Sequence, residues 1–398
     1  MADLRGRTAI TGVGWTELSK NSGRSTIALA TEAALAAIAD AGLAPTQIDG
    51  LVTYYWGPRD TPAPPELAAA LGLEKCSMSF CDSSGGAWAA AAIAAAAMAV
   101  YSGVCRHVLV YRAANSRSVA PAGTGHDLWP SGQRQWNEPF GASHAATLYG
   151  PHVSAYLHEF GLENSDLAEL AVLQRSHATL NRKAMMRTPI TVADHQASPW
   201  IIEPFRLLDC SMWNDGAMAV VVSATRDAKR MRRTPVAVRA VSGGTLGAPV
   251  RPARARRHWE LNALELAPAL YARAGIAASD LDLAQVYDPF TGMAMLHIEQ
   301  FGLTPPGAAP TAIRAGELGL DGRIPVNTHG GHLSEGNLVG LGHVIEAVQQ
   351  LRDTGVADDE CTGTHDFDRG RCRQVRDPEL ALVAGESGDS GMILGRAA

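Results

Sequence analysis

Two stretches of this 398-residue chain repeat one another, and the repeat limits the folds that the chain can adopt. Residues 41–54 and 274–287 share, without a gap, Ala-Gly, an aliphatic residue, Ala, an aliphatic-Asp pair and a final tyrosine. A helical pattern precedes each copy and a strand pattern ends each. Further along, Gly85-Gly86 and Gly330-Gly331 each introduce a helical stretch of small residues. The repeat therefore predicts a duplicated α/β unit, so that an active site would be assembled from matching positions of the two halves.

The size and composition of the chain exclude several classes of protein. Its length suits two domains or one duplicated domain, and its 46% hydrophobic residues allow a large core. A net charge of −6 argues against general nucleic-acid binding. No apolar run reaches the roughly 18 residues of a membrane span, and the N-terminal pattern is not that of a signal peptide. Six cysteines without a disulfide framework are typical of a reduced protein, so we expect a cytoplasmic protein.

Strand and helix patterns alternate twice along the chain. We expect an N-terminal half at 1–230 and a C-terminal half at 231–398. At about 113–200 the alternation breaks and aromatic residues gather, which indicates an inserted cap over the site. The alternation predicts an α/β fold with two sheets and helices layered between them.

The densest motif in the chain is the segment 327–340. Its fourteen residues hold four glycines, two histidines and two asparagines. Glycines let backbone amides approach a ligand closely, and polar side chains on a rigid loop are typical of a site. A plain glycine-rich turn with surface histidines is the alternative.

This segment resembles the thiolase pattern Asn-x-x-Gly-Gly-x-x-x-x-Gly-His-Pro-x-Gly in its glycines and in Asn327. The repeat, the Ala-rich helix after Gly86 and the strand after Asp215-Gly216 fit the same superfamily. Residues 112–116 and 208–210 look like its sterol-carrier or lipid-transfer-protein branch. The resemblance covers nearly the whole chain and implies a thiolase fold, a duplicated five-layer α-β-α-β-α arrangement with an inserted cap.

Two departures from the thiolase pattern remove the machinery of an acyl-enzyme. Ser83 occupies the slot of the nucleophilic cysteine, and Asn337 replaces the histidine of Gly-His-Pro. An asparagine cannot act as a general base, although it can donate a hydrogen bond to an oxyanion. Cys81 lies two residues before the slot. It could be activated by the helix N-terminus, or it could be a structural thiol.

Part of this branch resembles thiolases in fold but cleaves β-hydroxyacyl-CoA thioesters by retro-aldol chemistry. The resemblance to these steroid side-chain-cleaving aldolases implies the same reaction on a bulky or steroid acyl group, without a covalent cysteine intermediate. The CoA thioester would be the substrate, with no other cofactor and no metal. The resemblance also implies a homodimer paired through an exposed sheet edge and a small OB-fold/zinc-ribbon partner protein. These aldolases carry a second tyrosine where Asn337 stands.

Tyr287 is the candidate for proton transfer, because it ends the repeated strand fifty residues before Asn337. A free phenol titrates near pH 10, so Tyr287 would need nearby donors to act as a base, or would act as an acid in the synthetic direction. A core tyrosine at the end of a strand is the alternative. Asp288 could orient Tyr287 or cap the next helix.

Two histidines and two glycines complete the candidate site. His329 and His332 could each supply a proton or hold a water molecule, or be satisfied loop histidines. Gly330 and Gly331 are candidates for contact with the CoA thioester. We expect His343 to be structural. Glu335 could be a base, but we expect it to be exposed to solvent.

Weaker signals and other functions stay open. The arginines of 251–257 could bind the CoA phosphates or form a solvated loop. Residues 361–372 contain metal-ligand types, but their spacing matches no zinc pattern. The alternatives to an aldolase are an acyltransferase that uses Cys81 or an unusual nucleophile, and a non-catalytic acyl-CoA-binding subunit.

Overall fold

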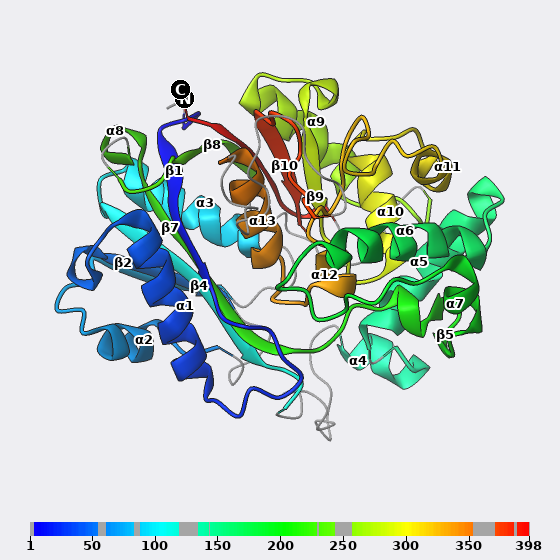
Figure 1. The fold of residues 1–398 in the computed structure, drawn as a ribbon, viewed down its shortest axis with the longest axis horizontal. Coiled ribbons are helices and arrows are strands. Elements are labelled where there is room, and N and C mark those ends of the chain that lie inside the picture. The colour runs from blue at the N-terminus through cyan, green and yellow to red at the C-terminus, as the bar shows by residue number, and fades with distance from the viewer. Residues whose placement is uncertain are drawn as a thin grey trace.

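A computed structural model describes residues 4–54, 61–82, 88–118, 134–142, 144–228, 231–242, 257–352, 371–385 and 388–397. Within these residues, nine strands form one mixed sheet (Figure 1). In spatial order the strands are β3 (Met78–Asp82), β2 (Gly50–Tyr54), β4 (His107–Asn115), β7 (Asp215–Ala224), β1 (Thr8–Trp15), β8 (Val236–Ser242), β11 (Gly391–Arg396), β10 (Leu380–Ala384) and β9 (Leu283–Val286).

The sheet consists of two related halves joined at β1 and β8. Only Ala9 with Ala237 and Ile10 with Val236 pair across this join. Outward from the join, the first half runs β1, β7, β4, β2 and β3, and the second runs β8, β11, β10 and β9. In the second half, a parallel bridge between Ala284 of β9 and Val326 corresponds to the pairing of β2 with β3 in the first half. The duplication is confirmed, but the expectation of two separate sheets was wrong, because this short antiparallel contact makes them continuous.

The helices of the repeat end in the same way in both halves. Helix α1 (Thr26–Ala41) ends at Gly42 and helix α9 (Ala263–Ala274) ends at Gly275, each glycine with a φ of 74°. In this left-handed conformation the glycine N–H closes onto carbonyls of the last turn. A short 3₁₀ turn follows each, η1 (Pro45–Gln47) and η4 (Ala278–Asp280), and leads into β2 and β9. The shared Ala-Gly of the sequence repeat is therefore a shared helix terminus.

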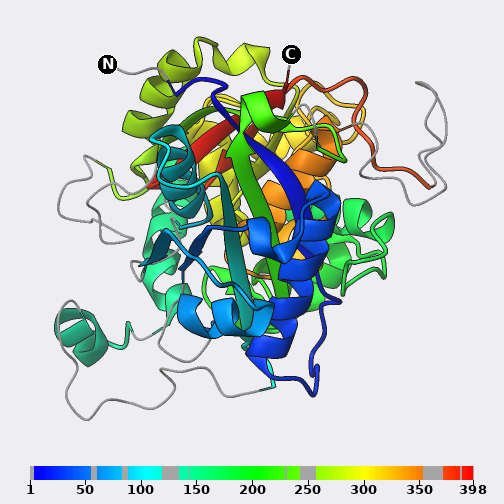
Figure 2. The same cartoon turned by 90° about the vertical axis from the view of Figure 1, so that its left-hand side faces the viewer.

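The helices form three layers around the two half-sheets. Helices α3 (Trp88–Tyr101) and α13 (Leu341–Leu351) contact strands of both halves and fill the space between them. Helices α1 and α2 (Pro64–Leu71) pack on the outer face of the first half, as Figure 2 shows. Helices α9 and α10 (Thr291–Gln300) share the outer core of the second half. The expected five-layer arrangement is thus confirmed.

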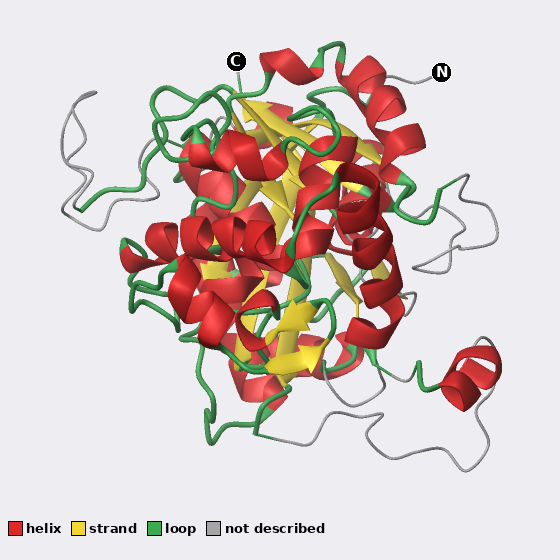
Figure 3. Cartoon of the chain, turned by 90° about the vertical axis from the view of Figure 1, so that its right-hand side faces the viewer, coloured by secondary structure: helices red, strands yellow, loops and turns green. Residues whose placement is uncertain are grey.

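The described residues between β4 and β7 form an insertion whose helices α5 (Ala145–Phe160) and α6 (Asn164–Thr179) pack on the second half, on the side that faces the viewer in Figure 3. Helix α5 lies against α10, and α6 contacts α10, α11 (Ala309–Arg314) and α12 (Gly331–Ser334). Its elements are α4 (Arg134–Asn137), η2 (Glu138–Phe140), α5 (Ala145–Phe160), α6 (Asn164–Thr179), α7 (Val192–Ala197), β5 (Trp200–Ile202), β6 (Phe205–Arg206) and η3 (Leu207–Asp209). Because β4 continues to Asn115, the insertion begins after the expected position 113.

Two further expectations concern the cellular setting of the chain. Within the described ranges, no helix is long and apolar enough to cross a membrane. Cys372 is disulfide-bonded, so the expectation of fully reduced cysteines is wrong at this position.

The short helix α8 (Thr225–Ala228) follows β7 and completes the elements of the first half.

A buried aspartate attaches the insertion to α10. Asp209 is fully buried, and its Oδ1 lies 2.5 Å from the hydroxyl of Thr291 and 2.8 Å from Nε2 of His195. Its Oδ2 accepts the backbone N–H of Arg206 at 2.7 Å. One carboxylate therefore joins α7, η3 and the first turn of α10.

Replacement of Asp209 is expected to loosen the insertion. Asp209→Ala leaves these buried donors without their acceptor and should destabilise the fold by about 3 kcal/mol. The measurements are the thermal midpoint and amide hydrogen exchange in residues 145–209. Asp194→Ala is the control, since Asp194 is an exposed carboxylate in the capping box of α7 and its replacement should have a much smaller effect. Equal effects of the two substitutions would contradict the attachment.

Candidate active site

The loop at 327–340 is fixed to the end of β9 by the side chain of Asn327. Its Oδ1 accepts the backbone N–H of Val286 at 2.7 Å, and its Nδ2 donates to the carbonyl of Val286 at 3.0 Å. The residue has a φ of 48°, a left-handed conformation in which asparagine is enriched. The amide thus extends the sheet by one residue and places the loop beside Tyr287 and Asp288.

The glycine pair of the motif is required for close packing. Gly331 has a φ of 61°, and a Cβ built on it would lie 2.1 Å from Oδ2 of Asp288. A Cβ on Gly330 would lie 2.6 Å from the Cβ of Ala178 on α6. Both glycines therefore let protein groups approach the backbone. Contact of this pair with the CoA thioester stays a prediction.

Asp288 caps helix α12 from the other side of the site. Its Oδ1 accepts the backbone N–H of His332 at 3.0 Å, and its Oδ2 accepts that of Leu333 at 3.2 Å. The expectation that it might cap the next helix, α10, was wrong, because these partners lie 44 and 45 residues further along the chain. Burial raises the pKa of Asp288, and the nearby His343 opposes that rise.

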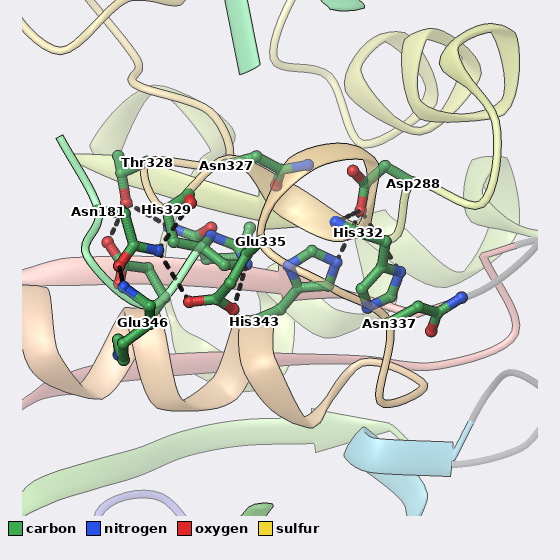
Figure 4. A network of polar contacts seen from close by, with 12 residues as sticks. Asn181, Asp288, Asn327, Thr328, His329, His332, Glu335, Asn337, His343 and Glu346 are labelled. Atoms are coloured by element: carbon green, nitrogen blue, oxygen red, sulfur yellow. Dashed lines mark hydrogen bonds and ion pairs between the residues drawn. The ribbon is translucent and has the colours of Figure 1, made fainter. Parts of the chain in front are cut away.

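Two buried imidazoles, those of His343 and His332, lie beside this carboxylate, and a third, that of His329, lies beyond His343 (Figure 4). His343 Nε2 lies 3.0 Å and His332 Nδ1 lies 3.5 Å from Oδ1 of Asp288. The ring centroids of His332 and His343 are 4.3 Å apart, and those of His329 and His343 are 5.0 Å apart. All three side chains have no exposed area, so the alternative of surface histidines is wrong.

His329 and His332 are held in the neutral state. Burial, and then the neighbouring His343, lower the pKa of His329 and of His332 well below the ordinary value. Neither ring nitrogen of His329 forms a hydrogen bond with the described residues. Because unsatisfied buried polar groups are rare outside functional sites, this supports a chemical role for the cluster.

Tyr287 lies directly on this cluster. Its ring meets that of His332 edge-on, with centroids 4.8 Å apart and planes at 84°, and only 3% of the residue is exposed. Its carbonyl accepts a hydrogen bond from Nδ1 of His297 at 2.7 Å. His297 is fully buried, and burial lowers its pKa to about 4. The backbone of Tyr287 is therefore held by the neutral His297 of α10.

Asn337 is half-buried and presents a donor to the site. Its Oδ1 accepts the backbone N–H of Val339 at 2.9 Å, which fixes the direction of the amide. One Nδ2 proton points to the hydroxyl of Ser211 at 3.3 Å, and its backbone N–H donates to Oδ1 of Asn214 at 2.6 Å. The second Nδ2 proton has no partner among the described residues. It can donate to an oxyanion.

Glu335 and His343 belong to the site more closely than their sequence context indicates. Glu335 is 3% exposed, so the expectation of a solvent-exposed carboxylate was wrong. Asn181 donates to its Oε1 at 2.9 Å, and its Oε2 lies 3.7 Å from Nε2 of His329. Burial raises the pKa of Glu335, and the charge of Lys183 opposes that rise. The cluster is thus bounded by a buried carboxyl group at each end.

Several of the expected site residues are not brought together here. Ser83, most of the arginine-rich segment and the segment with Cys361 and His365 lie outside the described residues. Cys81 is an exposed residue of the edge strand β3. Sequence reasoning missed His297, whose only signal was its place on the helix that follows Tyr287.

Asp288, His332 and His343 are also a possible set of metal ligands. Their ligand atoms lie within 4.8 Å of one another. However, Nε2 of His332 accepts the backbone N–H of Gly340 at 3.2 Å. In a neutral ring the proton is then on Nδ1, which faces Asp288 and has no lone pair for a metal.

Metal analysis tests this reading of the cluster. We expect no stoichiometric zinc, manganese or other transition metal in the purified protein, and no change in thermal midpoint on treatment with a chelator. If the protein instead binds one metal ion per chain and Asp288→Asn loses that ion, the proton of the His332 imidazole is on Nε2 rather than on Nδ1.

The buried His297 predicts a defined response to acid. Between pH 6.5 and about 4 the unfolded chain binds a proton here that the folded chain does not, so the free energy of unfolding falls as the pH falls. At about 1.4 kcal/mol per pH unit, the full effect is about 3 kcal/mol. His297→Asn keeps a donor for the carbonyl of Tyr287 and should reduce this loss, as measured by denaturant unfolding at several pH values. His158→Asn, at an exposed position of α5, should follow the original protein. If His297→Asn loses as much unfolding free energy in acid as the original protein, His297 is not the source of this pH dependence.

Comparison with known proteins adds independent information on this site and fold. A family model described as thiolase C-terminal domain-like matches residues 255–365. A steroid side-chain-cleaving aldolase from Thermomonospora curvata is 37% identical over 371 residues, which is 89% of this chain and 93% of that protein. A 17-hydroxy-3-oxo-4-pregnene-20-carboxyl-CoA lyase from Mycobacterium tuberculosis is 37% identical over 376 residues, with the same coverage.

Solved structures agree with these relatives. The Ltp2-ChsH2(DUF35) aldolase is 35% identical, with a TM-score of 0.88 over 100% of this chain and 99% of that chain. Human mitochondrial 3-ketoacyl-CoA thiolase shares only 14% identity but has a TM-score of 0.66 over the full length of both chains, a likeness of fold alone. The chain therefore belongs to the thiolase superfamily, in the sterol-carrier and lipid-transfer-protein branch that contains the steroid side-chain-cleaving aldolases.

Proposed function

We propose that this protein cleaves a carbon–carbon bond of a β-hydroxyacyl-CoA thioester by a retro-aldol reaction, and that the acyl group is a steroid or similarly bulky group. The observation that carries the proposal is the position of Tyr287 against the buried, neutral imidazole of His332, beside the turn that also presents the amide of Asn337. Ser83 and Asn337 stand where a thiolase needs a thiol and an imidazole. The similarity to the two lyases supports the same reaction.

The reaction requires one base and one set of oxyanion donors. A base removes the proton of the β-hydroxyl, the bond between Cα and Cβ breaks, and its electron pair moves to Cα. The products at this stage are a carbonyl compound and a thioester enolate, and a proton then returns to Cα. Tyr287 is assigned to proton transfer, and the Nδ2–H of Asn337 to the enolate oxygen. No bond to the enzyme is formed, so no nucleophile is needed.

The substitution of Asn337 for the second tyrosine distinguishes this chain within the branch. Its amide can donate but cannot exchange a proton at ordinary pH. Proton transfer is therefore assigned to Tyr287, with His332 beside it and His329 beyond His343. This division of roles leaves the CoA thioester as the only small molecule that the reaction needs.

We also propose a cytoplasmic homodimer that works with a small OB-fold/zinc-ribbon protein. Strand β3 is an edge strand of the sheet, and exposed apolar side chains lie on it and on the neighbouring α3, including Phe80 at 43% and Met98 at 53%. An exposed apolar edge of this kind favours pairing with another chain. The name of the similar Ltp2-ChsH2(DUF35) structure contains a second component, which supports a partner protein.

Product analysis on a panel of CoA thioesters, with and without the partner, tests the reaction. Tyr287→Phe should lower kcat by about 10² to 10⁴, the usual contribution of a general acid or base. Asn337→Ala should lower it by about 10² to 10³, the usual contribution of an oxyanion donor. Cys81→Ala is the control and should retain the original rate.

The alternative functions give different results in the same assay. An acyl group trapped on a cysteine, together with loss of turnover in Cys81→Ala, would establish an acyltransferase. If the original protein binds CoA thioesters but converts none of them in the presence of its partner, it is a binding subunit.

A further inference from the structure

Tyr54 is the counterpart of Tyr287 in the sequence repeat, and the two tyrosines meet at the same turn. Tyr54 ends β2 as Tyr287 follows the end of β9. Its hydroxyl donates to the carbonyl of Val339, 3.1 Å away and 285 residues along the chain. From the other half, the ring of Tyr287 lies against Gly340, where an added Cβ would be 3.7 Å from its Cδ2. The turn at 337–340 is therefore held between matching residues of both halves.

Val339 occupies a strained conformation at this turn. Its φ is 53°, in the left-handed region, which a β-branched side chain rarely enters. Such a residue is strained relative to ordinary backbone. It persists because its neighbours hold it on both sides: Tyr54 binds its carbonyl, and Oδ1 of Asn337 accepts its N–H at 2.9 Å. Backbone strain of this kind is concentrated at functional sites.

This conformation determines where Asn337 points its donor. Because the N–H of Val339 occupies Oδ1, the Nδ2 group must face the opposite direction, toward Ser211. The next residue, Gly340, donates its N–H to Nε2 of His332 and so sets the tautomer of that ring. A change at Val339 would therefore move a donor and an imidazole together.

Tyr54 is suited to hold this turn at any working pH. The residue has no exposed area, and burial raises its pKa far above the ordinary value, although Arg112 opposes that rise. Its hydroxyl thus stays protonated and stays a donor. By the same property it cannot exchange protons with a substrate near neutral pH.

We infer that Tyr54 is a positioning residue for the carbon–carbon bond cleavage: its hydroxyl holds Val339 in the left-handed conformation and thereby directs the Asn337 amide toward the enolate oxygen. The effect on rate rests on the proposed function. The effect on the backbone of the turn does not.

A set of three variants tests the inference. In Tyr54→Phe we expect kcat to fall about tenfold, the effect of one lost hydrogen bond, while KM for the CoA thioester changes by less than about twofold. Glycine enters the left-handed region without strain, so Tyr54→Phe/Val339→Gly should be several-fold faster than Tyr54→Phe alone. Tyr111→Phe is the matched control. Tyr111 is buried in the same half and donates to the carbonyl of Pro62 at 2.8 Å, away from the site. Its removal should leave kcat unchanged.

The outcomes separate positioning from simple stability. If Tyr54→Phe retains the original kcat, or if its loss is matched by Tyr111→Phe and not relieved by Val339→Gly, the inference is wrong. If the original protein cleaves no thioester, the proposed function fails, and a crystal structure of Tyr54→Phe decides the inference alone. A relaxed Val339 with negative φ and a reoriented Asn337 would then support the inference, whereas an unchanged turn would refute it.

Discussion

The buried carboxylate of Asp288 organises the whole site. A carboxylate removed from water must be surrounded by donors, because an unpaired buried charge is very costly. Asp288 therefore draws in the first turn of α12 and the imidazoles of His332 and His343. This contact requires that residue 331 have no side chain and that the loop turn back over β9. The glycines, the left-handed Asn327 and the position of Tyr287 all follow from the need to satisfy one side chain.

The surroundings of Tyr287 are polar but carry little charge. Burial keeps His329 and His332 neutral and shifts Asp288 and Glu335 toward their protonated forms. Electrostatic interactions are stronger in such a poorly solvated region than in water. A transient enolate placed there is stabilised by oriented donors. A full positive charge is not needed there, and it would not improve binding of the uncharged substrate thioester. The arrangement suits a reaction in which negative charge exists only briefly.

The sequence predicted those features that depend on neighbours along the chain. The repeat predicted the two helix–turn–strand units, including their ends at Gly42 and Gly275, and the glycine motif predicted the loop of the site. The sequence could not predict that Asp288 caps a helix 44 residues away, or that Glu335 is buried against Asn181. Neither residue pattern nor propensity records which segments pack together. The continuous sheet escaped prediction for the same reason, since two residue pairs at β1 and β8 leave no local signal.

Duplication explains how the two repeat tyrosines reach one turn and yet differ in role. A duplicated fold presents each position of the pocket twice, but a substrate needs only one reacting group. Tyr54 has no exposed area and is bonded to a carbonyl, which favours the neutral phenol and fixes it as a donor. The ring of Tyr287 lies instead against the imidazole of His332. In the roles proposed above, the same residue at the same position of the repeat is a support in one half and a reacting group in the other, because its polar contacts differ.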